Sequence, residues 1–528
     1  MKKNIVYSVL LCALATTASA NIVSNKTFMR ARDTLSNNAL LMRTGHLRGH
    51  WKSKQNRIGS TISVAGYYRS SHNEMALATA FGGGQEVNNT QDGIIRIEAG
   101  QGSSMADRAY NLYSNAMDHI GHAGTTAGGM YGTVTLNPSR TEAGAHISYK
   151  QDLEFIAPGL ALHVEAPVIS VMHDLGATFA GTAHSESTYG ESGTSLKNYF
   201  NGRSLLKAAN SKQQGLKYAR IDGASHSASG IADIHIGLSK RWFTNSMFRA
   251  HSSVYATIPT IGQNTGEHLF EPQLGSHHCG AGIKGTIMTS LWRNHEEQAA
   301  LRLSATLDYR YLFRAEEVRT LGIYNHWYNV VATSSQYRNI GLAGATETQP
   351  AANALTRLVS VKPGQLFDLI MSARYRFKEY SVGIHYNMHA RDAESVKLLP
   401  STRWFDGEYG MMPDSCAVNT DGGIIVGSNN FTVGGALQQE GNTTTITKDS
   451  AGANVGDNNA AQYYITTSPC SAPTAITHKL AASGEWSCRS FHFPFAISIG
   501  AEYELNGFRK SNNSILSWAV WSKASVCF

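Results

Sequence analysis

The sequence predicts an all-β protein, a single up-and-down antiparallel transmembrane β-barrel of 12 strands with short turns at one end and long loops at the other. Three observations predict this fold. Many segments alternate apolar and polar residues with a period of two, long and short connections alternate between those segments, and an N-terminal export signal precedes a chain without an apolar helix.

The N-terminus has the pattern of a cleavable signal peptide over residues 1–20. Lys2 and Lys3 precede an apolar stretch at 5–14, and positions 18–20 read Ala-Ser-Ala, the small-x-small pattern before a cleavage site. The apolar stretch is about half of the roughly 20 residues that a membrane-spanning helix needs. We therefore expect an exported protein that is either soluble or a β-barrel.

Composition excludes several classes of protein. The chain is 42% hydrophobic and only 16% charged, with 50 glycines and 12 prolines, so it is neither a disordered chain nor a disulfide scaffold. The formal net charge of +7 is spread along the chain without a long Lys/Arg run, which argues against a nucleic-acid partner. We also expect no cofactor.

The spacing of the cysteines gives little indication of a metal, redox or disulfide site. Of the 6 cysteines, one lies in the signal peptide, so an odd number remains in the mature chain and at least one stays unpaired or pairs between chains. No CxxC pair occurs, which argues against a zinc or redox site. Cys416 and Cys470 lie in one long loop and form the candidate disulfide.

Alternation is clearest in the segment 300–313, where the odd positions are apolar or aromatic while the even positions include Arg302, Asp308 and Arg310. A membrane strand places one such face against lipid and the other against the lumen. The remaining predicted strands are 57–69, 143–153, 160–171, 231–243, 248–260, 280–292, 367–377, 380–391, 475–486, 493–505 and 515–528.

The lengths of the connections distinguish the two ends of the predicted barrel. Lys378-Glu379 is the shortest and predicts a two-residue hairpin, whereas the longest connections are 70–142, 172–230, 314–366 and 392–474. Outer-membrane barrels have short periplasmic turns and long extracellular loops. The barrel domain 57–528 should therefore begin and end at the periplasmic rim.

Residues 21–56 fall outside the strand pattern. They contain the sequences FMRAR at 28–32 and NALLM at 38–42, which predict a short amphipathic helix or an extra strand. We expect a periplasmic N-terminal arm or a partial plug. If 38–51 instead formed a wall strand, the barrel would need a further strand to keep the number of strands even, which would give 14 strands.

The predicted lumen face carries more basic than acidic residues. An aqueous interior with this excess would mildly favour anions, whereas charge pairs across the interior would close it; both interpretations stay open. The candidate pore-lining residues are Arg249, Lys284, Arg302, Asp308, Arg310, Arg374, Arg376, His385, His389, Arg391, Glu502 and Glu504.

Histidines offer no metal site that spacing can define. The His277-His278-Cys279 sequence and the pair His385/His389 lack a third ligand at a predictable position. We therefore expect no metal. The GxSxG nucleophile motif is absent, so we expect no enzyme, and an outer-membrane hydrolase is only a remote alternative.

The end of the chain resembles an outer-membrane assembly signal. Trp518, Val526 and Phe528 share one face of the last predicted strand, and the chain ends on that aromatic residue. The resemblance implies that the barrel-assembly machinery is a partner.

The whole mature chain resembles Gram-negative outer-membrane β-barrels of the porin type. More narrowly, 257–272 and 358–369, with the arm around Phe28 and Arg30, resemble uncharacterised outer-membrane proteins of Dependentiae-type bacteria. The resemblance implies the bacterial cell outer membrane as location and outer-membrane lipid as a partner; it supplies no catalytic residues.

Two functions follow from this sequence. One is a porin-like channel for passive diffusion of small hydrophilic solutes, with a weak anion preference. The other is a structural or adhesive surface protein that acts through its extracellular loops, which make up more than half of the mature chain. A homo-oligomer is compatible with both.

Overall fold

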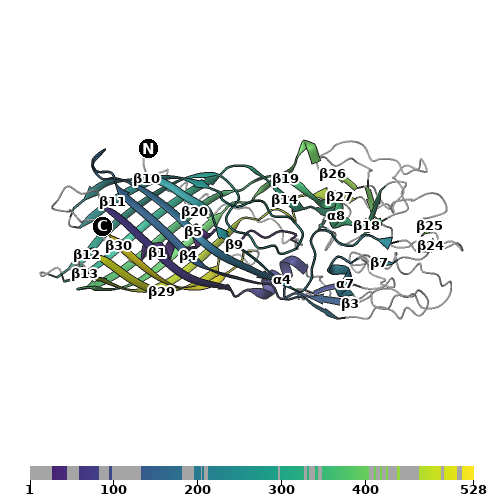
Figure 1. Cartoon of the computed structure of the whole chain (residues 1–528), viewed down its shortest axis with the longest axis horizontal. Helices are drawn as coiled ribbons and strands as arrows, with labels where there is room; N and C mark the ends of the chain where they lie inside the picture. Colours follow the sequence, from purple (N-terminus) through teal and green to yellow (C-terminus); the bar gives the residue numbers. More distant parts are fainter. Residues whose placement is uncertain are drawn as a thin grey trace.

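The computed structural model describes residues 26–44, 59–82, 94–97, 132–180, 196–203, 205–206, 212–245, 247–294, 298–325, 330–331, 339–342, 348–402, 409–411, 417–418, 424–425, 437–439, 463–488, 493–507 and 514–528. Its centre is a closed antiparallel barrel (Figure 1). The wall strands are β1 (Ser60–Ser71), β4 (Ser139–Asp152), β5 (Leu160–Asp174), β9 (Ser225–Ile231), β10 (Ile234–Thr244), β11 (Phe248–Ile258), β12 (Gly280–Arg293), β13 (Ala299–Leu312), β20 (Gln365–Phe377), β21 (Tyr380–Arg391), β28 (Ala475–Cys488), β29 (Phe495–Asn506) and β30 (Ser517–Cys527).

The ring closes at 12 strands. β1 pairs with β30 along their whole lengths, which joins the first wall strand to the last. β9 and β10 pair with different halves of β5 on either side of a break at residues 232–233, so together they count as one wall strand. The prediction of 12 strands is confirmed. The alternative of 14 is wrong: residues 39–43 of the proposed extra strand form a helix inside the ring, and its residues 45–51 lie outside the described part of the chain.

Each of the twelve predicted segments overlaps a wall strand. The largest boundary error is at the segment predicted for 231–243, which in the structure already begins at Ser225 with β9. The predicted two-residue hairpin is confirmed, because Phe377 pairs with Tyr380 across Lys378-Glu379. We call the end of the barrel with this hairpin the turn end and the opposite end the loop end; the C-terminal Phe528 lies at the turn end (Figure 1).

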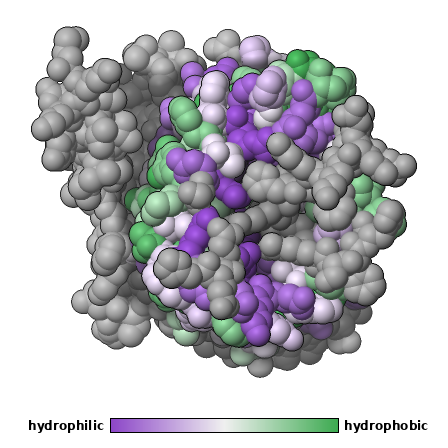
Figure 2. All heavy atoms as spheres, turned by 90° about the vertical axis from the view of Figure 1, so that its left-hand side faces the viewer, coloured by the Kyte–Doolittle hydropathy of each residue, from purple (hydrophilic) through white to green (hydrophobic). Residues whose placement is uncertain are grey.

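Alternation along the wall separates an apolar outside from a polar inside. In β30 every second residue is buried, including Lys523 at 1% exposure, while Trp518, Val520 and Val526 between them are 37–45% exposed. Viewed from the turn end, hydrophilic residues gather toward the centre of the ring and hydrophobic ones toward its rim (Figure 2). This is the distribution expected of a barrel whose outer face contacts hydrocarbon.

Within the described residues no helix is long and apolar enough to cross a membrane.

The loop end carries small folded units of its own (Figure 1). One apolar cluster packs Phe81, Phe200 and Phe270, and a second packs Leu321, Leu355 and Val361. The helices there are α4 (Glu74–Gly82), α7 (Leu196–Phe200), α8 (Ala351–Leu355) and the 3-10 helix η3 (Pro400–Thr402). The strands are β2 (Ile94–Ile97), β3 (Gly132–Thr135), β6 (Thr178–Ala180), β7 (Leu205–Leu206), β8 (Lys212–Gln213), β14 (Ala315–Thr320), β15 (Gly322–Asn325), β16 (Val330–Val331), β17 (Asn339–Leu342), β18 (Thr348–Pro350), β19 (Thr356–Lys362), β22 (Ser395–Leu398), β23 (Tyr409–Met411), β24 (Ala417–Val418), β25 (Ile424–Ile425), β26 (Leu437–Gln439) and β27 (Tyr463–Thr466).

Candidate functional site

The lumen contains part of the chain itself. Residues 26–44, which we call the luminal segment, are all buried or half-buried. The segment forms two short helices, α2 (Thr34–Asn37) and α3 (Ala39–Arg43), and the Asp33 carboxylate caps α2 by accepting a bond from Ser36 N at 3.0 Å. Leu40 and Leu41 pack against inward-facing apolar residues of several wall strands, which fixes the depth of the segment in the ring.

The upper end of the segment is anchored among loop-end residues by a buried charge network. Arg30 lies 2.8 Å from Glu317 Oε1 and also pairs with Glu394. His278 Nε2 lies 2.6 Å from the same Glu317 oxygen, and Arg319 pairs with the other one. Burial by itself would raise the pKa of Glu317, but Arg319 and Arg30 outweigh it and hold that pKa well below its usual range.

Backbone carbonyls of the loop end hold the start of the segment. Lys26 Nζ donates to Ser468 O at 2.9 Å and to Ser471 O at 3.2 Å. Thr27 N donates to Pro469 O at 3.1 Å. The chain therefore enters the ring from the loop end and descends toward the turn end.

Near the loop end of the wall, Arg32 joins the segment to three wall strands. Its Nη2 lies 2.7 Å from Asp368 Oδ1 of β20 and its Nη1 lies 3.3 Å from Glu504 Oε1 of β29; Nη2 also donates to Asn387 of β21. Asp368 in addition accepts a bond from Ser36 Oγ at 2.7 Å. Both charges of the Arg32–Asp368 pair are shielded from solvent, which is tolerated only because each is paired.

Two asparagines continue these contacts with the neighbouring strands β28 and β1. Arg69 Nη2 of β1 donates to Asn37 O and Asn38 Oδ1, both at 3.1 Å. Lys479 Nζ of β28 donates to Asn37 Oδ1 at 3.0 Å. Glu502 of β29 accepts from both cations, at 3.1 Å from Arg69 and 2.9 Å from Lys479, so their charges are compensated.

The lower end of the segment is held by cations of the wall. Lys523 Nζ of β30 donates to Met42 O at 2.8 Å and to Thr44 O at 2.7 Å. Arg374 Nη2 of β20 donates to Arg43 O at 2.8 Å. Such bonds from charged donors are worth about 1.5–3 kcal/mol each, and water can replace every one of them. The segment is thus held firmly but not covalently by the described wall.

Arginines dominate the lumen below the segment. Arg302 of β13 and Arg374 of β20 face each other in register, and Arg376 and Arg249 lie near the same end. Glu485 of β28 compensates Arg374 at 3.1 Å. Like charges directly opposite each other on paired strands repel, and Glu485 offsets part of this repulsion at Arg374.

The structure brings most candidate pore-lining residues together around the luminal segment. Arg310 pairs with Asp33 at 2.9 Å, and Arg391 Nη1 donates to Arg30 O at 3.0 Å. His389 lies 3.1 Å from Asp368, whereas His385 instead bonds to Ser372 and Ser483 of the wall. Lys284 and Asp308 pair with each other at 3.2 Å.

Other predicted site residues lie elsewhere. Trp518, Val526 and Phe528 are exposed on the outside of the barrel. Cys416 lies outside the described residues, so the candidate disulfide falls there; Cys470 is a buried thiol whose Sγ lies 3.2 Å from Thr467 O, and burial raises its pKa to about 12.

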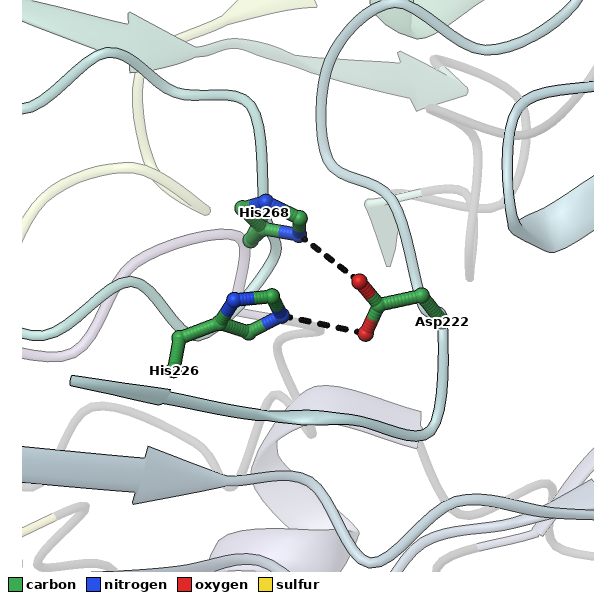
Figure 3. Close-up of side chains that lie close together, drawn as sticks. All are labelled: Asp222, His226 and His268. Atoms are coloured by element: carbon green, nitrogen blue, oxygen red, sulfur yellow. Dashed lines mark hydrogen bonds and ion pairs between the residues drawn. The ribbon is translucent and has the colours of Figure 1, made fainter.

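One cluster of side chains was not predicted from the sequence. At the loop end Asp222, His226 and His268 converge, and the Asp222 carboxylate faces both imidazoles from one side (Figure 3). Asp222 and His226 are four positions apart, a spacing too common to single out, and nothing in the sequence points to His268 as the third member.

The apolar outer face and the polar, charged interior together define a transmembrane β-barrel. No family model and no curated protein matches this chain. Solved structures with a similar course include an outer-membrane channel of Pseudomonas putida F1, 9% identical over 89% of this chain and 96% of that one, with a TM-score of 0.37. The CymD monoaromatic hydrocarbon channel is 8% identical over 96% and 98%, with a TM-score of 0.27.

The outer-membrane protease OmpT of Escherichia coli is 5% identical over 90% of this chain and 96% of that one, with a TM-score of 0.19. At these identities and TM-scores the likenesses carry no information about the activity of this chain.

Proposed function

We propose that this protein is a bacterial outer-membrane channel for small hydrophilic solutes and that the luminal segment, residues 26–44, closes it as a plug. The observation that carries the proposal is the way the segment is held. It lies inside a ring whose inner face is mostly polar. Besides the packing of Leu40 and Leu41, its contacts with that face include hydrogen bonds and ion pairs with β1, β13, β20, β28, β29 and β30.

Energetics favour a removable plug over a permanent core. A buried charge without a partner is costly, but the same charge in water needs none. When the segment leaves, water can solvate Arg69, Lys479 and Lys523, whose present partners are oxygens of the segment and the carboxylates of Glu142 and Glu502. The polar interior is therefore stable both when closed and when filled with water.

The proposed channel prefers anions weakly. Its selectivity would arise at the turn end, where Arg302 and Arg374 face each other and Arg249 and Arg376 lie nearby. Pore-lining charge raises the local concentration of its counter-ion, and low-dielectric walls strengthen this effect.

Export and assembly belong to the same proposal. Residues 1–20 act as the signal peptide, and the exposed residues Trp518, Val526 and Phe528 present the signal to the barrel-assembly machinery. The resemblance to Dependentiae-type outer-membrane proteins, the homo-oligomeric state and the Cys416–Cys470 disulfide stay predictions.

The second candidate function, a structural or adhesive surface protein, is favoured by one observation. The loop end contains packed apolar clusters around Phe81 and Leu355, so parts of the connections are folded units that can present a defined surface. A permeability measurement separates this candidate from a channel, since a surface protein needs no path through its lumen.

Liposome swelling tests the channel. The refolded protein is inserted into liposomes, which are then diluted into isotonic solutions of small sugars and of anionic or cationic solutes. We expect slow swelling for the wild type and faster swelling for Arg32→Gln, which loosens the plug. Arg220→Gln serves as the control, because it removes a partly exposed ion pair with Glu267 outside the lumen. Equal impermeability of all three proteins would contradict the proposal.

A further inference from the structure

The cluster of Asp222, His226 and His268 joins two connections at the loop end. Asp222 precedes β9, His226 is the second residue of that strand, and His268 belongs to the connection between β11 and β12. The two stretches run side by side through backbone bonds: Arg220 N donates to Glu267 O at 2.8 Å, and Leu269 N donates to Arg220 O at 3.1 Å. The main chain itself therefore brings the three side chains together.

A tight turn orients the carboxylate. Asp222 Oδ1 accepts a bond from Ala224 N at 3.0 Å, and Gly223 between them has φ +69°, which favours glycine. Ile221, directly before Asp222, is fully buried in the apolar cluster around Phe270. The position of the carboxylate is thus fixed by the core beneath it.

The donor atoms are spaced as metal ligands are. His226 Nε2 lies 3.0 Å from Asp222 Oδ1, and His268 Nδ1 lies 3.5 Å from Asp222 Oδ2 (Figure 3). One ligand atom from each residue lies within 4.8 Å of the others. Ligands about 2.0–2.2 Å from a tetrahedral zinc ion are separated by roughly 3.3–3.6 Å, so a small adjustment would accommodate the ion.

The contacts within the chain leave the cluster incompletely satisfied. His268 Nδ1 is buried and makes no hydrogen bond, although it points toward Asp222. The two imidazole rings pack against each other with centroids 3.7 Å apart. Neutral imidazoles and an ionised carboxylate are the forms that bind a metal ion.

We propose that Asp222, His226 and His268 form a binding site for a divalent transition-metal ion of the zinc class, with the fourth position open to water. Two imidazoles and one carboxylate suit zinc and its first-row neighbours, whereas Ca²⁺ and Mg²⁺ prefer oxygen ligands throughout. The three side chains are 18–27% exposed, so an ion can reach them from solution.

The bound ion would link the connection that leads into β9 to the connection between β11 and β12. Both lie at the loop end of the barrel. An ion there would stiffen the mouth of the lumen. This site does not depend on the proposed channel function, since it requires only the loop geometry.

Metal titration of the full folded chain tests the site. The protein is prepared without a histidine tag, stripped with a chelator and titrated with Zn²⁺ by calorimetry, and with Co²⁺ by absorption, because tetrahedral Co²⁺ with nitrogen ligands has a diagnostic visible spectrum. We expect each chain to bind one metal ion tightly. Loss of an outer hydrogen bond to a ligand weakens metal binding about 10–100-fold, so His226→Gln and His268→Gln should weaken it by more than roughly 100-fold.

Two further variants distinguish a defined three-residue metal site from weak binding by unrelated histidines. His277→Asn changes a neighbouring histidine outside the cluster, at a position with φ +61° that asparagine tolerates, and should still bind one ion tightly. Asp222→Asn keeps the shape but not the charge and should lose most of the affinity. Absence of a tightly bound ion in the wild type, or equal affinity in His268→Gln when its heat-modifiable migration shows a folded barrel, would overturn the proposal.

Discussion

Arg32 and Asp368 are 336 positions apart in the chain, yet Arg32 Nη2 lies 2.7 Å from Asp368 Oδ1 inside the barrel. Both side chains are almost fully shielded from solvent, at 5% and 4% exposure. The pair joins the segment before the first strand to the wall, so its energy helps to determine how tightly that segment is held.

Breaking this pair should loosen the luminal segment. Removing one partner of a buried ion pair costs about 3–5 kcal/mol. Amide hydrogen exchange across 34–43 is therefore expected to speed by roughly 100-fold or more in Arg32→Gln, since each 1.4 kcal/mol is a factor of about ten. The double variant Arg32→Gln/Asp368→Asn should recover part of this loss, because no charge stays unpaired. Unchanged exchange in Arg32→Gln would contradict the assigned role.

The buried charge network that holds Arg30 at the loop end should stay intact from neutral to mildly acid pH. Burial would raise the pKa of Glu394, but Arg30 and Arg319 outweigh it and lower that pKa, and the pKa of Glu317 is lowered in the same way. A carboxyl with a lowered folded pKa stabilises above its unfolded pKa of about 4.3, and this stability is lost as pH falls through the folded value.

Hydrogen exchange of the peptide around Arg30, corrected for intrinsic pH effects, measures this dependence. We expect constant protection from pH 8 to about 5 and loss only below about 4, with a smaller loss in Glu394→Gln. Release with a midpoint near pH 6 would contradict the assignment of this dependence to Glu317 and Glu394.

Gly282 on β12 should be intolerant of a side chain. A Cβ there would lie 2.2 Å from Tyr255 Cζ, and the Tyr255 hydroxyl is bonded to Asp308. Gly282→Ala is expected to destabilise the barrel by about 1–3 kcal/mol through overpacking. Gly285→Ala on the same strand is the matched control, since a Cβ there meets nothing within 4 Å. Equal temperatures for the heat-induced gel shift of both variants would refute this.

The arginines at the turn end should set ion selectivity. In a variant lacking the plug, Arg302→Gln should move the reversal potential in a salt gradient toward lower anion preference, because one positive charge leaves the pore wall. Glu485→Gln should move it the opposite way, because this carboxylate compensates Arg374 at 3.1 Å. Shifts of the same sign in both variants would disprove the assignment.

The sequence predicted the wall well because lipid and lumen impose a period of two on each strand. The prediction failed at the start of the β9–β10 strand, where Ser225–Ile231 alternates serine, alanine and histidine with little contrast in polarity. The position of Asn37 and Asn38 inside the lumen could not be predicted, because the sequence of a polar segment buried in a polar lumen resembles that of a solvated loop. The contact of Asp222 with His268 depends on how two connections pack, which no local pattern records.

Closure of the lumen by residues 26–44 is tested most directly by current recordings in planar bilayers. The full chain and a variant lacking residues 26–44 are inserted under the same conditions, and heat-modifiable migration first confirms that both barrels are folded. We expect small or rare current steps for the full chain and large, stable, reproducible steps for the shortened one. Equal conductance of the two proteins, or silence of both, would contradict a channel closed by its own N-terminal segment.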